Sequence, residues 1–429
     1  MVPLMRTGPA KETARFDESS RAFMPTQIEN GTPISTSSRV QAEVGTHGGR
    51  LRVLHVVARL GLGGTEHGVL KVLNGLGEEQ FEHRLCAVRG VDADFASRMN
   101  VATKAYSAGS AKPGFQFPLF RLMRIMKEYR PHIVHTRNFG ALEGLFAARL
   151  VNVPVAIHSE HGYELEILGG LPLRRRILCR ALFPMADAVF AVTNELRTYH
   201  SEQSWLTAEK IRVIHNGVNT DRFAPLTCDA SRLRKDLGLP TNRFLIGSVG
   251  RLVPIKDHST LLQAADLLLC QGNNLHVVLV GDGPERATLQ HYVAGTPVLS
   301  GRVTFLGASD RVPELMKAMD VFVLPSISEG MSNTVLEAMA TALPVVVTHA
   351  GGNPEMVEHG FSGLLFAPRD IATLALHLGR LIENADLRRH LGAAARRRVV
   401  ERFSLAEMIR HYRDLYFELA GKLSQREGT

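Results

Sequence analysis

The sequence has few cysteines, and they lie far apart. Four occur in 429 residues, at Cys86, Cys179, Cys228 and Cys270, and the nearest two are 42 positions apart, since 270 minus 228 is 42. This spacing excludes CxxC-type metal and redox centres, and it makes a disulfide framework unexpected. We interpret each cysteine as a small buried apolar side chain in a protein of a reducing compartment.

Long uncharged apolar stretches are also missing. No run approaches the roughly 18 residues that a membrane-spanning helix needs, and the N-terminus lacks a charged-then-apolar signal pattern. We therefore expect a chain that is soluble or peripheral to a membrane rather than integral. The composition, with 45% hydrophobic and 21% charged residues, is ordinary for a globular protein and excludes a fully disordered or fibrous chain.

The positive charge lies outside the first 50 residues. The formal net charge is +8, and those 50 residues hold six basic and five acidic groups, which leaves about +7 for the other 379. Residues 1–49 lack periodicity and contain turn-rich stretches, so we expect a disordered leader. The remainder is long enough for two or three domains. Nucleic acid is not an expected partner, because the basic groups lack interleaved aromatic residues and no binding motif occurs.

Strand and helix patterns alternate from Leu51 onwards. Short β-rich apolar runs are expected to be strands at Leu51–Ala58, Arg84–Val88, Ile133–His135, Val155–His158, Ala188–Val192 and Ile211–Ile214. After a linker at Asp221–Leu239 a second series follows, at Phe244–Ser248, Leu275–Val280, Val303–Phe305, Val321–Leu324, Val345–Thr348 and Gly363–Phe366. Alternation with helices predicts parallel sheets that are covered on both faces.

The expected fold class is therefore α/β, with two Rossmann-like domains in tandem. We assign residues 50–222 to an N-terminal domain, 223–402 to a C-terminal domain, and 403–422 to a helix that packs back on the N-terminal domain. Ser404 and Glu407 match the S-x-x-E capping box at the start of this helix. Doubly wound domains bind ligands at the carboxyl ends of their strands, so two facing domains would form a ligand cleft between them.

One loop after a predicted strand has an unusual set of hydrogen-bonding groups. It contains Glu329, followed by backbone N–H groups at Gly330, Met331 and Ser332 near the start of a helix that carries Glu337. A helix N-terminus attracts electron-rich groups, and ionised carboxylates accept hydrogen bonds from sugar hydroxyls. The segment predicts a site for a hydroxyl-rich ligand, although either carboxylate alone could be an ordinary surface group.

Two further segments follow the first strands of the second series. Arg251 and Lys256 come after the first strand. The planar guanidinium of an arginine and the ammonium of a lysine would together suit a nucleotide diphosphate. Gly281 and Gly283 come after the second strand, in a G-D-G-P turn. The alternative for the cations is a solvated pair on the surface.

These motifs together resemble the retaining glycosyltransferases of the GT-B fold, of the family 4 (group 1) type. The resemblance covers residues 51–420 and rests above all on the E-x7-E signature of Glu329 and Glu337. It implies two facing Rossmann-like domains, an interdomain cleft and a C-terminal crossover helix. It also implies that Glu337 holds the ribose hydroxyls, that Glu329 holds a hydroxyl of the donor sugar, and that Arg251 and Lys256 bind the diphosphate.

The Gly-rich loop Gly61–Gly64 does not fit a dinucleotide site. The G-x-G-x-x-G spacing would require glycine where Glu66 stands, and the turn at Gly281 fails in the same way at Arg286. An NAD-dependent oxidoreductase is therefore disfavoured. Gly63 and Gly64 instead resemble the G-G-x-E loop whose backbone approaches donor phosphates and acceptor, and a tight strand–helix turn is the alternative.

Polar residues at two strand ends of the first domain suggest the acceptor side. The resemblance places a functional histidine at His161, close to the donor sugar. We predict acceptor contacts for Arg137, Asn138 and Glu160, each of which could instead be structural. The amino-acid sequences of residues 135–143 and 159–163 also resemble those of the sugar transferases of exopolysaccharide clusters associated with the PEP-CTERM/exosortase system. That implies cytoplasmic transfer from a nucleotide-sugar donor to a lipid-linked glycan acceptor.

The chemistry implied by the resemblance is front-face attack, in which the departing phosphate oxygen helps to deprotonate the acceptor hydroxyl. We judge that no Asp-x-Asp at a strand end suggests a divalent metal, and we therefore predict no metal and no other cofactor. Two other functions stay open on the same fold. One is a sugar-nucleotide epimerase or hydrolase, and the other is a non-catalytic partner that binds nucleotide sugars.

Two arginine-rich segments have no assigned role in this chemistry. In the predicted helix at Leu173–Phe183, Arg175, Arg176 and Arg180 gather on one face. These arginines could contact acidic lipids on the inner side of the cytoplasmic membrane. Alternatively, they could form a solvated basic face on a helix whose other side packs on the core. The second segment, Arg388–Arg398, we interpret as a solvated helix face.

Overall fold

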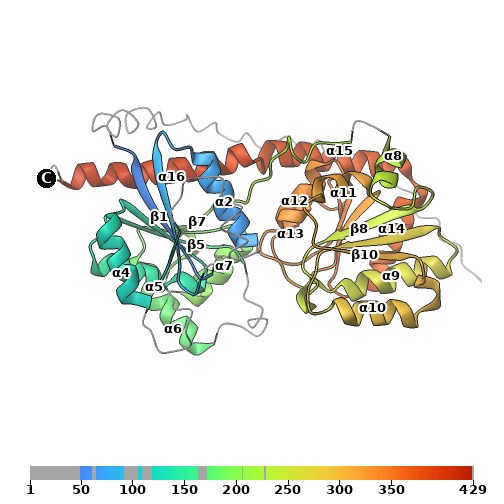
Figure 1. Ribbon diagram of the computed structural model, residues 1–429, viewed down its shortest axis with the longest axis horizontal. Helices are drawn as coiled ribbons and strands as arrows, with labels where there is room; N and C mark the ends of the chain where they lie inside the picture. The colour runs from blue at the N-terminus through green and yellow to red at the C-terminus, as the bar shows by residue number, and fades with distance from the viewer. Residues whose placement is uncertain are drawn as a thin grey trace, which may run out of the picture.

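The computed structural model describes residues 49–59, 64–90, 105–108, 118–162, 172–204, 206–226 and 229–427. Nearly all of the predicted leader and Gly61–Gly63 lie outside the described residues. Within them the chain forms two parallel sheets with helices on their faces, one sheet after the other along the chain (Figure 1). The predicted fold class, two Rossmann-like domains of the GT-B type, is confirmed.

The N-terminal sheet has the strand order β3-β2-β1-β4-β5-β6-β7, and its neighbouring strands pair in parallel. Its strands are β1 (Leu51–Val57), β2 (Phe81–Ala87), β3 (Ala105–Ser107), β4 (Ile133–Arg137), β5 (Val155–Glu160), β6 (Ala188–Ala191) and β7 (Ile211–Val213). Its helices are α2 (Gly64–Leu76), α4 (Pro118–Tyr129), α5 (Glu143–Leu150), α6 (Leu173–Leu182) and α7 (Asn194–Gln203). The central strands are buried on both faces, which explains their near-continuous apolar runs.

Two of these elements were not predicted. Strand β3 has only three residues and is largely exposed, so it has no apolar run to mark it. Helix α7 buries only Leu196 and His200 among its ten residues, so it has no apolar periodicity. Its start is instead set by Thr193, whose hydroxyl accepts a hydrogen bond from the N–H of Leu196.

The C-terminal sheet has the order β10-β9-β8-β11-β12-β13 and is also parallel. Its strands are β8 (Phe244–Val249), β9 (Leu275–Val280), β10 (Val303–Gly307), β11 (Val321–Leu324), β12 (Val345–Thr348) and β13 (Leu364–Phe366). Its helices are α8 (Ala230–Asp236), α9 (His258–Cys270), α10 (Arg286–Gly295), α11 (Val312–Ala318), α12 (Asn333–Ala340), α13 (Asn353–Met356), α14 (Ile371–Glu383) and α15 (Ala385–Arg402). The order of this sheet places the ends of β8 and β11 side by side, and these two ends carry the predicted donor residues.

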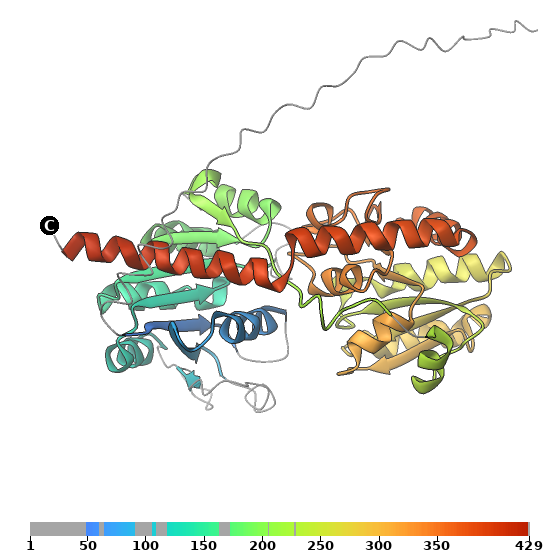
Figure 2. The ribbon, with the colours of Figure 1, turned by 90° about the horizontal axis from the view of Figure 1, so that it is seen from above.

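The last helix, α16 (Leu405–Glu427), returns to the N-terminal domain. Figure 2 shows α15 and α16 end to end, with α15 over the second domain and α16 over the first. Tyr412 and Tyr416 of α16 pack in one core cluster with Ile133 and Ile157 of the N-terminal sheet. The turn between the two helices is tied to the linker, because Val218 donates to Phe403 and accepts from Leu405 through their backbones.

The predicted capping box at the start of α16 is only half formed. The Ser404 hydroxyl accepts a hydrogen bond from the Glu407 N–H at 3.3 Å. The Glu407 carboxylate, however, pairs with Arg410 one turn further on and does not reach back to Ser404.

The interpretation of Arg388–Arg398 as a solvated face is wrong for three of its members. Arg388 donates to the carbonyls of Leu381 and Ile382. Arg396 donates to the carbonyls of Thr220 and Ala340, and Arg398 donates to the carbonyls of Glu355 and Met356. All three guanidinium groups thus hold neighbouring segments against α15. Because one-turn spacing alone does not show what packs on a helix, the sequence could not identify these acceptors.

Candidate functional site

The E-x7-E segment lies at the carboxyl end of β11. Helix α12 is capped by Ser332, whose hydroxyl accepts from the N–H of Val335. In the described part of the structure, the N–H groups of Gly330, Met331 and Ser332 donate no hydrogen bond. The predicted nest of donors is therefore present at the start of α12, where it is available to an electron-rich ligand.

Glu329 and Lys256 lie together in this loop region. They form an ion pair, and their side chains keep exposed fractions of 10% and 18%. The Ser326 hydroxyl donates to the same carboxylate oxygen of Glu329 at 2.6 Å. Arg251, at the end of β8, is exposed. The two predicted phosphate-binding cations and the predicted sugar-binding carboxylate thus share one end of the sheet.

The G-D-G-P turn lies against the segment that carries Arg251. A Cβ at Gly281 would lie 1.9 Å from the carbonyl oxygen of Gly250, and one at Gly283 would lie 2.3 Å from that of Leu252. Gly281 also has a φ of 136°, which disfavours any side chain. Only glycine lets the ends of β8 and β9 approach so closely, so both residues shape the predicted phosphate end of the site.

The two domains meet at Gly330 and His161. A Cβ at Gly330 would lie 2.5 Å from the carbonyl oxygen of His161 and 2.8 Å from the Cα of Gly162. This contact brings the predicted functional histidine of the first domain to the E-x7-E loop of the second. The residues are 169 positions apart in the sequence, since 330 minus 161 is 169.

A set of hydrogen bonds holds His161 in place. Its N–H donates to Asn138 Oδ1 at 2.8 Å, and its ring Nε2 is 2.9 Å from the Ser159 hydroxyl. The same hydroxyl is 2.9 Å from Nε2 of His135. Removal from solvent, with the cation of Arg137 nearby, lowers the pKa of His161 to about 3. The imidazole is therefore neutral near pH 7 and can only exchange neutral hydrogen bonds with a ligand.

The three predicted acceptor residues lie in different surroundings. Asn138 contacts His161, as described above. Arg137 is 1% exposed and donates to Nδ1 of His55 at 2.9 Å, beneath α16. Glu160 is 3% exposed on the opposite face of β5, where its carboxylate is 3.1 Å from Nε2 of His158. The acceptor contacts of all three residues stay predictions.

Glu337 lies one turn into α12 and is half-buried. Burial raises the pKa of its carboxyl group to about 7, although Lys71 and Arg222 act in the opposite direction. Gly64, the last residue of the Gly-rich loop, begins α2, and Gly63 lies outside the described residues. Predictions about that loop's contact with phosphate are therefore not addressed by the geometry.

Sequence reasoning missed a carboxylate that joins the two domains. Glu355 of α13 accepts hydrogen bonds from the N–H groups of Asn194 and Glu195 at 3.0 Å each, and from Nδ2 of Asn194 at 2.8 Å. His215 also faces it, at 3.4 Å. Glu355 therefore caps a helix of the other domain. The only sequence feature that could have pointed to Glu355 is its position just after two consecutive glycines, Gly351 and Gly352.

A second missed residue is Lys71, which interrupts the apolar stripe of α2 between the buried side chains of Val69 and Val72.

Across the described residues, no group of three or more His, Cys, Asp or Glu side chains is placed to hold a metal ion. Helices long and apolar enough to cross a bilayer are likewise absent from the part of the chain described here.

Two family profiles match the chain in succession. The profile described as Glycosyltransferase Family 4 matches residues 62–222, and the one described as Glycosyl transferases group 1 matches residues 229–398. The first matched region contains the N-terminal sheet except β1 (Leu51–Val57), and the second contains the whole C-terminal sheet.

Named relatives are similar over most of the chain. An Escherichia coli UDP-Gal:alpha-D-GlcNAc-diphosphoundecaprenol alpha-1,3-galactosyltransferase is 29% identical, over 86% of this chain and 97% of that protein. A Mycobacterium tuberculosis (strain ATCC 25618 / H37Rv) GDP-mannose-dependent alpha-(1-6)-phosphatidylinositol monomannoside mannosyltransferase is 31% identical, over 64% and 73%. The crystal structure of Anabaena Alr3699/HepE in complex with UDP shares the fold, with a TM-score of 0.75 at 22% identity, over 85% of this chain and 99% of that one.

Proposed function

The chain belongs to the family 4 (group 1) glycosyltransferases, and from this premise we propose that it is a retaining enzyme that transfers a sugar from a nucleotide-sugar donor to a lipid-linked glycan acceptor. Its activity is that of a hexosyltransferase-type glycosyltransferase. Retention, the lipid-linked acceptor and a role in bacterial exopolysaccharide biosynthesis are the proposed parts.

The observation that carries the proposal is the meeting of Gly330 with His161. Gly330 follows Glu329, which pairs with Lys256, and it contacts the backbone carbonyl of His161, so this contact supports a donor site between the two domains. A donor held by its diphosphate at Lys256 and Arg251, and by its sugar at Glu329, would then present its anomeric carbon to the first domain.

The proposed step needs no protein nucleophile. The bond between the anomeric carbon and the phosphate oxygen breaks, and the acceptor oxygen attacks from the same face. The acceptor proton passes to the departing phosphate oxygen, so that the charges balance. Lys256, Arg251 and the free N–H groups at the start of α12 would stabilise the negative charge that develops on the diphosphate. We further propose that the reaction requires no metal ion or other cofactor.

The lipid-linked acceptor is supported by the name of the Escherichia coli relative and by the surface of α6. Leu173, Ile177 and Leu178 are 69%, 56% and 45% exposed. Arg175, by contrast, is half-buried, with its guanidinium 4.8 Å from the ring centre of Phe139. The apolar face that was expected to pack on the core is therefore the exposed one, and the arginines that were expected to face a membrane or solvent are half-buried. An exposed apolar stripe suits an acyl surface.

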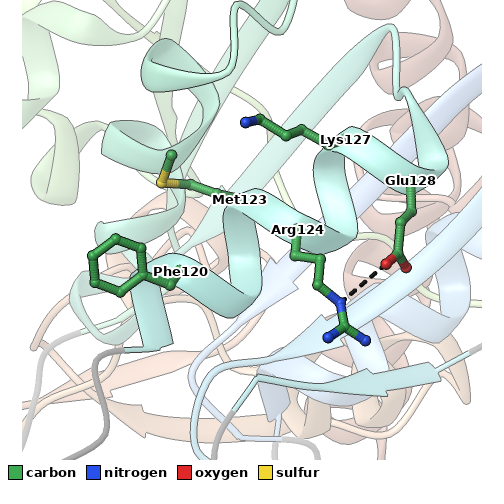
Figure 3. A pocket seen from close by; sticks show the side chains of 5 residues that line it. All are labelled: Phe120, Met123, Arg124, Lys127 and Glu128. Carbon is green, nitrogen blue, oxygen red and sulfur yellow. Dashed lines mark hydrogen bonds and ion pairs between the residues drawn. The ribbon is translucent and has the colours of Figure 1, made fainter.

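A second surface of the same domain has a similar character. Helix α4 packs beside α5, and α5 packs on the turn that follows α6. Figure 3 shows the side chains of α4 that line a shallow hollow, which are those of Phe120, Met123, Arg124, Lys127 and Glu128. Phe120 is 71% exposed, and Arg124 is paired with Glu128 at 3.0 Å. Aromatic and cationic side chains together fit the interface of an anionic membrane, at the inner face of the cytoplasmic membrane.

The test is donor turnover with and without acceptor. The protein is first screened against UDP-, GDP- and ADP-sugars by thermal shift, and the stabilising donor is then incubated with lipid extracts that contain polyprenyl-diphosphate glycans. Transfer that depends on the extract, with the anomeric configuration of the donor kept in the product by NMR, is expected. Donor consumption without any acceptor would favour an epimerase or hydrolase instead, and an inverted product would reject retention.

A further inference from the structure

Lys71 connects the two domains beside the proposed donor site. It lies on α2 of the first domain, and its ammonium donates to Asn333 Oδ1 at 3.1 Å and to the carbonyl of Gly217 at 2.8 Å. Asn333 is the first residue of α12 in the second domain, and Gly217 lies in the segment between β7 and α8 that leads to the second domain. One side chain thus holds α2, the linker and α12 together.

The next residue on the same face of α12 is Glu337, since positions four apart are neighbours on a helix. Lys71 and Arg222 are the cations that act on its carboxyl group. Arg396, on the packed helix α15, uses its guanidinium on backbone carbonyls, including that of Ala340. The adjoining strands β11 and β12 carry no charged residue, and neither does the rest of α12. Lys71 and Arg222 are therefore the cations of the first domain that act on Glu337, and Lys71 is the one that also ties α2 to α12 by a hydrogen bond.

The protonation of Glu337 bears directly on its proposed role. A carboxylate accepts hydrogen bonds from both ribose hydroxyls only when it is ionised. Burial opposes ionisation, because it removes the charged form from water, and the pKa of about 7 leaves the group close to half-protonated at neutral pH. A nearby cation therefore decides how much of the protein is ready to bind ribose.

We propose that Lys71 is a positioning residue of the donor site, which supplies from the first domain the counter-charge for Glu337 and the tie that holds α12. The ribose subsite is then complete only when the two domains are together. This inference rests on the proposed function for its effect on donor binding, whereas the link between Lys71 and Glu337 can be tested without any ligand.

The first measurement is the titration of the Glu337 carboxyl carbon by NMR in the unliganded protein, with Glu337→Gln to assign the signal. In Lys71→Met the pKa of Glu337 should rise by about one to two units, and in Lys71→Arg it should stay near the wild-type value. The matched control is Lys235→Met, an exposed lysine of α8. A Lys71→Met protein in which Glu337 titrates as in the wild type would overturn the inference.

The second measurement is calorimetric binding of UDP, GDP and ADP between pH 6 and 9. For the nucleotide that the wild type binds, Lys71→Met should bind about 5- to 50-fold more weakly at pH 7 and within about threefold at pH 9, because a higher pH ionises Glu337 again. In a Glu337→Gln background, Lys71→Met should leave the pH dependence unchanged. An equal loss at every pH, with no rescue by Lys71→Arg, would reduce Lys71 to a packing role and reject the proposal.

The outcomes separate the two proposals. If the wild type binds none of the three nucleotides but the pKa of Glu337 moves in Lys71→Met, the proposed donor function fails and the Lys71–Glu337 link stands. If the wild type binds a nucleotide and Lys71→Met binds it equally well at pH 7, the function stands and the inference fails. Thermal unfolding of each variant shows whether the fold is retained, and Lys71→Arg serves where Lys71→Met does not fold.

Discussion

Lys256 and Glu329, 73 positions apart in the chain, form an ion pair at the neighbouring ends of β8 and β11. Lys256 therefore has a counter-ion beside it, and a diphosphate bound there, as we propose, would compete with Glu329 for the ammonium. The Ser326 hydroxyl also donates to this carboxylate, and it would keep Glu329 in place when the ammonium turned to the phosphate. On this proposal, one lysine would serve the site with and without its ligand.

We predict that Lys256→Met lowers kcat/KM by about 100- to 1000-fold, as expected when one donor to a developing negative charge is removed. The measurement is initial-rate turnover of the donor found by thermal shift. Lys235→Met, at an exposed position on α8, is the matched control and should be unchanged. A Lys256→Met enzyme with the wild-type rate would show that the lysine does not contact the diphosphate.

Asn138 should display a trade-off between stability and activity. Its φ of 58° and ψ of 166° fall in a region that only glycine occupies without strain, while its side chain holds the N–H of His161. Asn138→Gly should therefore increase the free energy of unfolding by about 1 kcal/mol, the strain relieved less one hydrogen bond, and decrease kcat.

The control for this prediction is Asn152→Gly, because Asn152 also has a positive φ, 55°, but lies in an exposed turn after α5. It should be stabilising without any loss of activity. Urea unfolding and steady-state kinetics on both variants decide the matter, and equal kinetics in the two would mean that Asn138 does not position His161.

Glu355 should stabilise the protein in a pH-dependent way. Burial alone would raise the pKa of its carboxyl group, but the hydrogen bonds from His215, Asn194 and Glu195 lower it to about 2. Since the pKa in the folded state is depressed below the ordinary value of 4.5 for a glutamate, the stabilisation is complete above about pH 4.5 and is lost as the pH falls towards 2.

Glu355→Gln should then decrease the free energy of unfolding by about 1–3 kcal/mol at pH 7, and its difference from the wild type should shrink below pH 4.5. Chemical denaturation at a series of pH values measures this, with Glu383→Gln at the exposed end of α14 as the control. A difference that is the same at pH 7 and pH 3 would contradict the assignment of charge to this contact.

The exposed stripe of α6 should bind anionic membranes. Ile177→Asp is expected to weaken sedimentation with phosphatidylglycerol-containing vesicles by about tenfold or more, because it replaces an exposed apolar side chain by a negative charge, which anionic lipids repel. Leu267→Asp, at a 45% exposed leucine on α9 of the other domain, is the matched control. Equal binding by both variants would place the membrane contact elsewhere.

Turnover should persist without divalent metal. With excess EDTA, and after dialysis against it, we expect the rate to stay at the untreated value, because cationic side chains and N–H groups are proposed to neutralise the diphosphate. Complete loss of turnover, restored by added Mg²⁺ or Mn²⁺, would reject the prediction.

Much of the fold could be predicted because a strand that is buried on both faces consists of a short run of apolar residues. The strands at Leu275–Val280 and Val321–Leu324 were predicted with the bounds that the structure has. The polar helix α7 could not be predicted in this way. Its start is set by hydrogen bonds to Thr193 and Glu355, and no apolar pattern reveals such bonds. Helix α6 was predicted, but the face it exposes was not, because amphipathicity does not say which side meets the core.

The sequence by itself determined the alternation of strands and helices, the end of the sheet where a ligand would lie, and the residue types suited to a diphosphate and a sugar. It did so because burial and backbone hydrogen bonding act over a few residues. Only the tertiary structure decided that Gly330 touches His161, that Lys256 pairs with Glu329 and that Lys71 donates to Asn333. Those contacts depend on how two separately formed sheets are placed against each other, and the close approaches that fix this placement join residues that no local pattern connects.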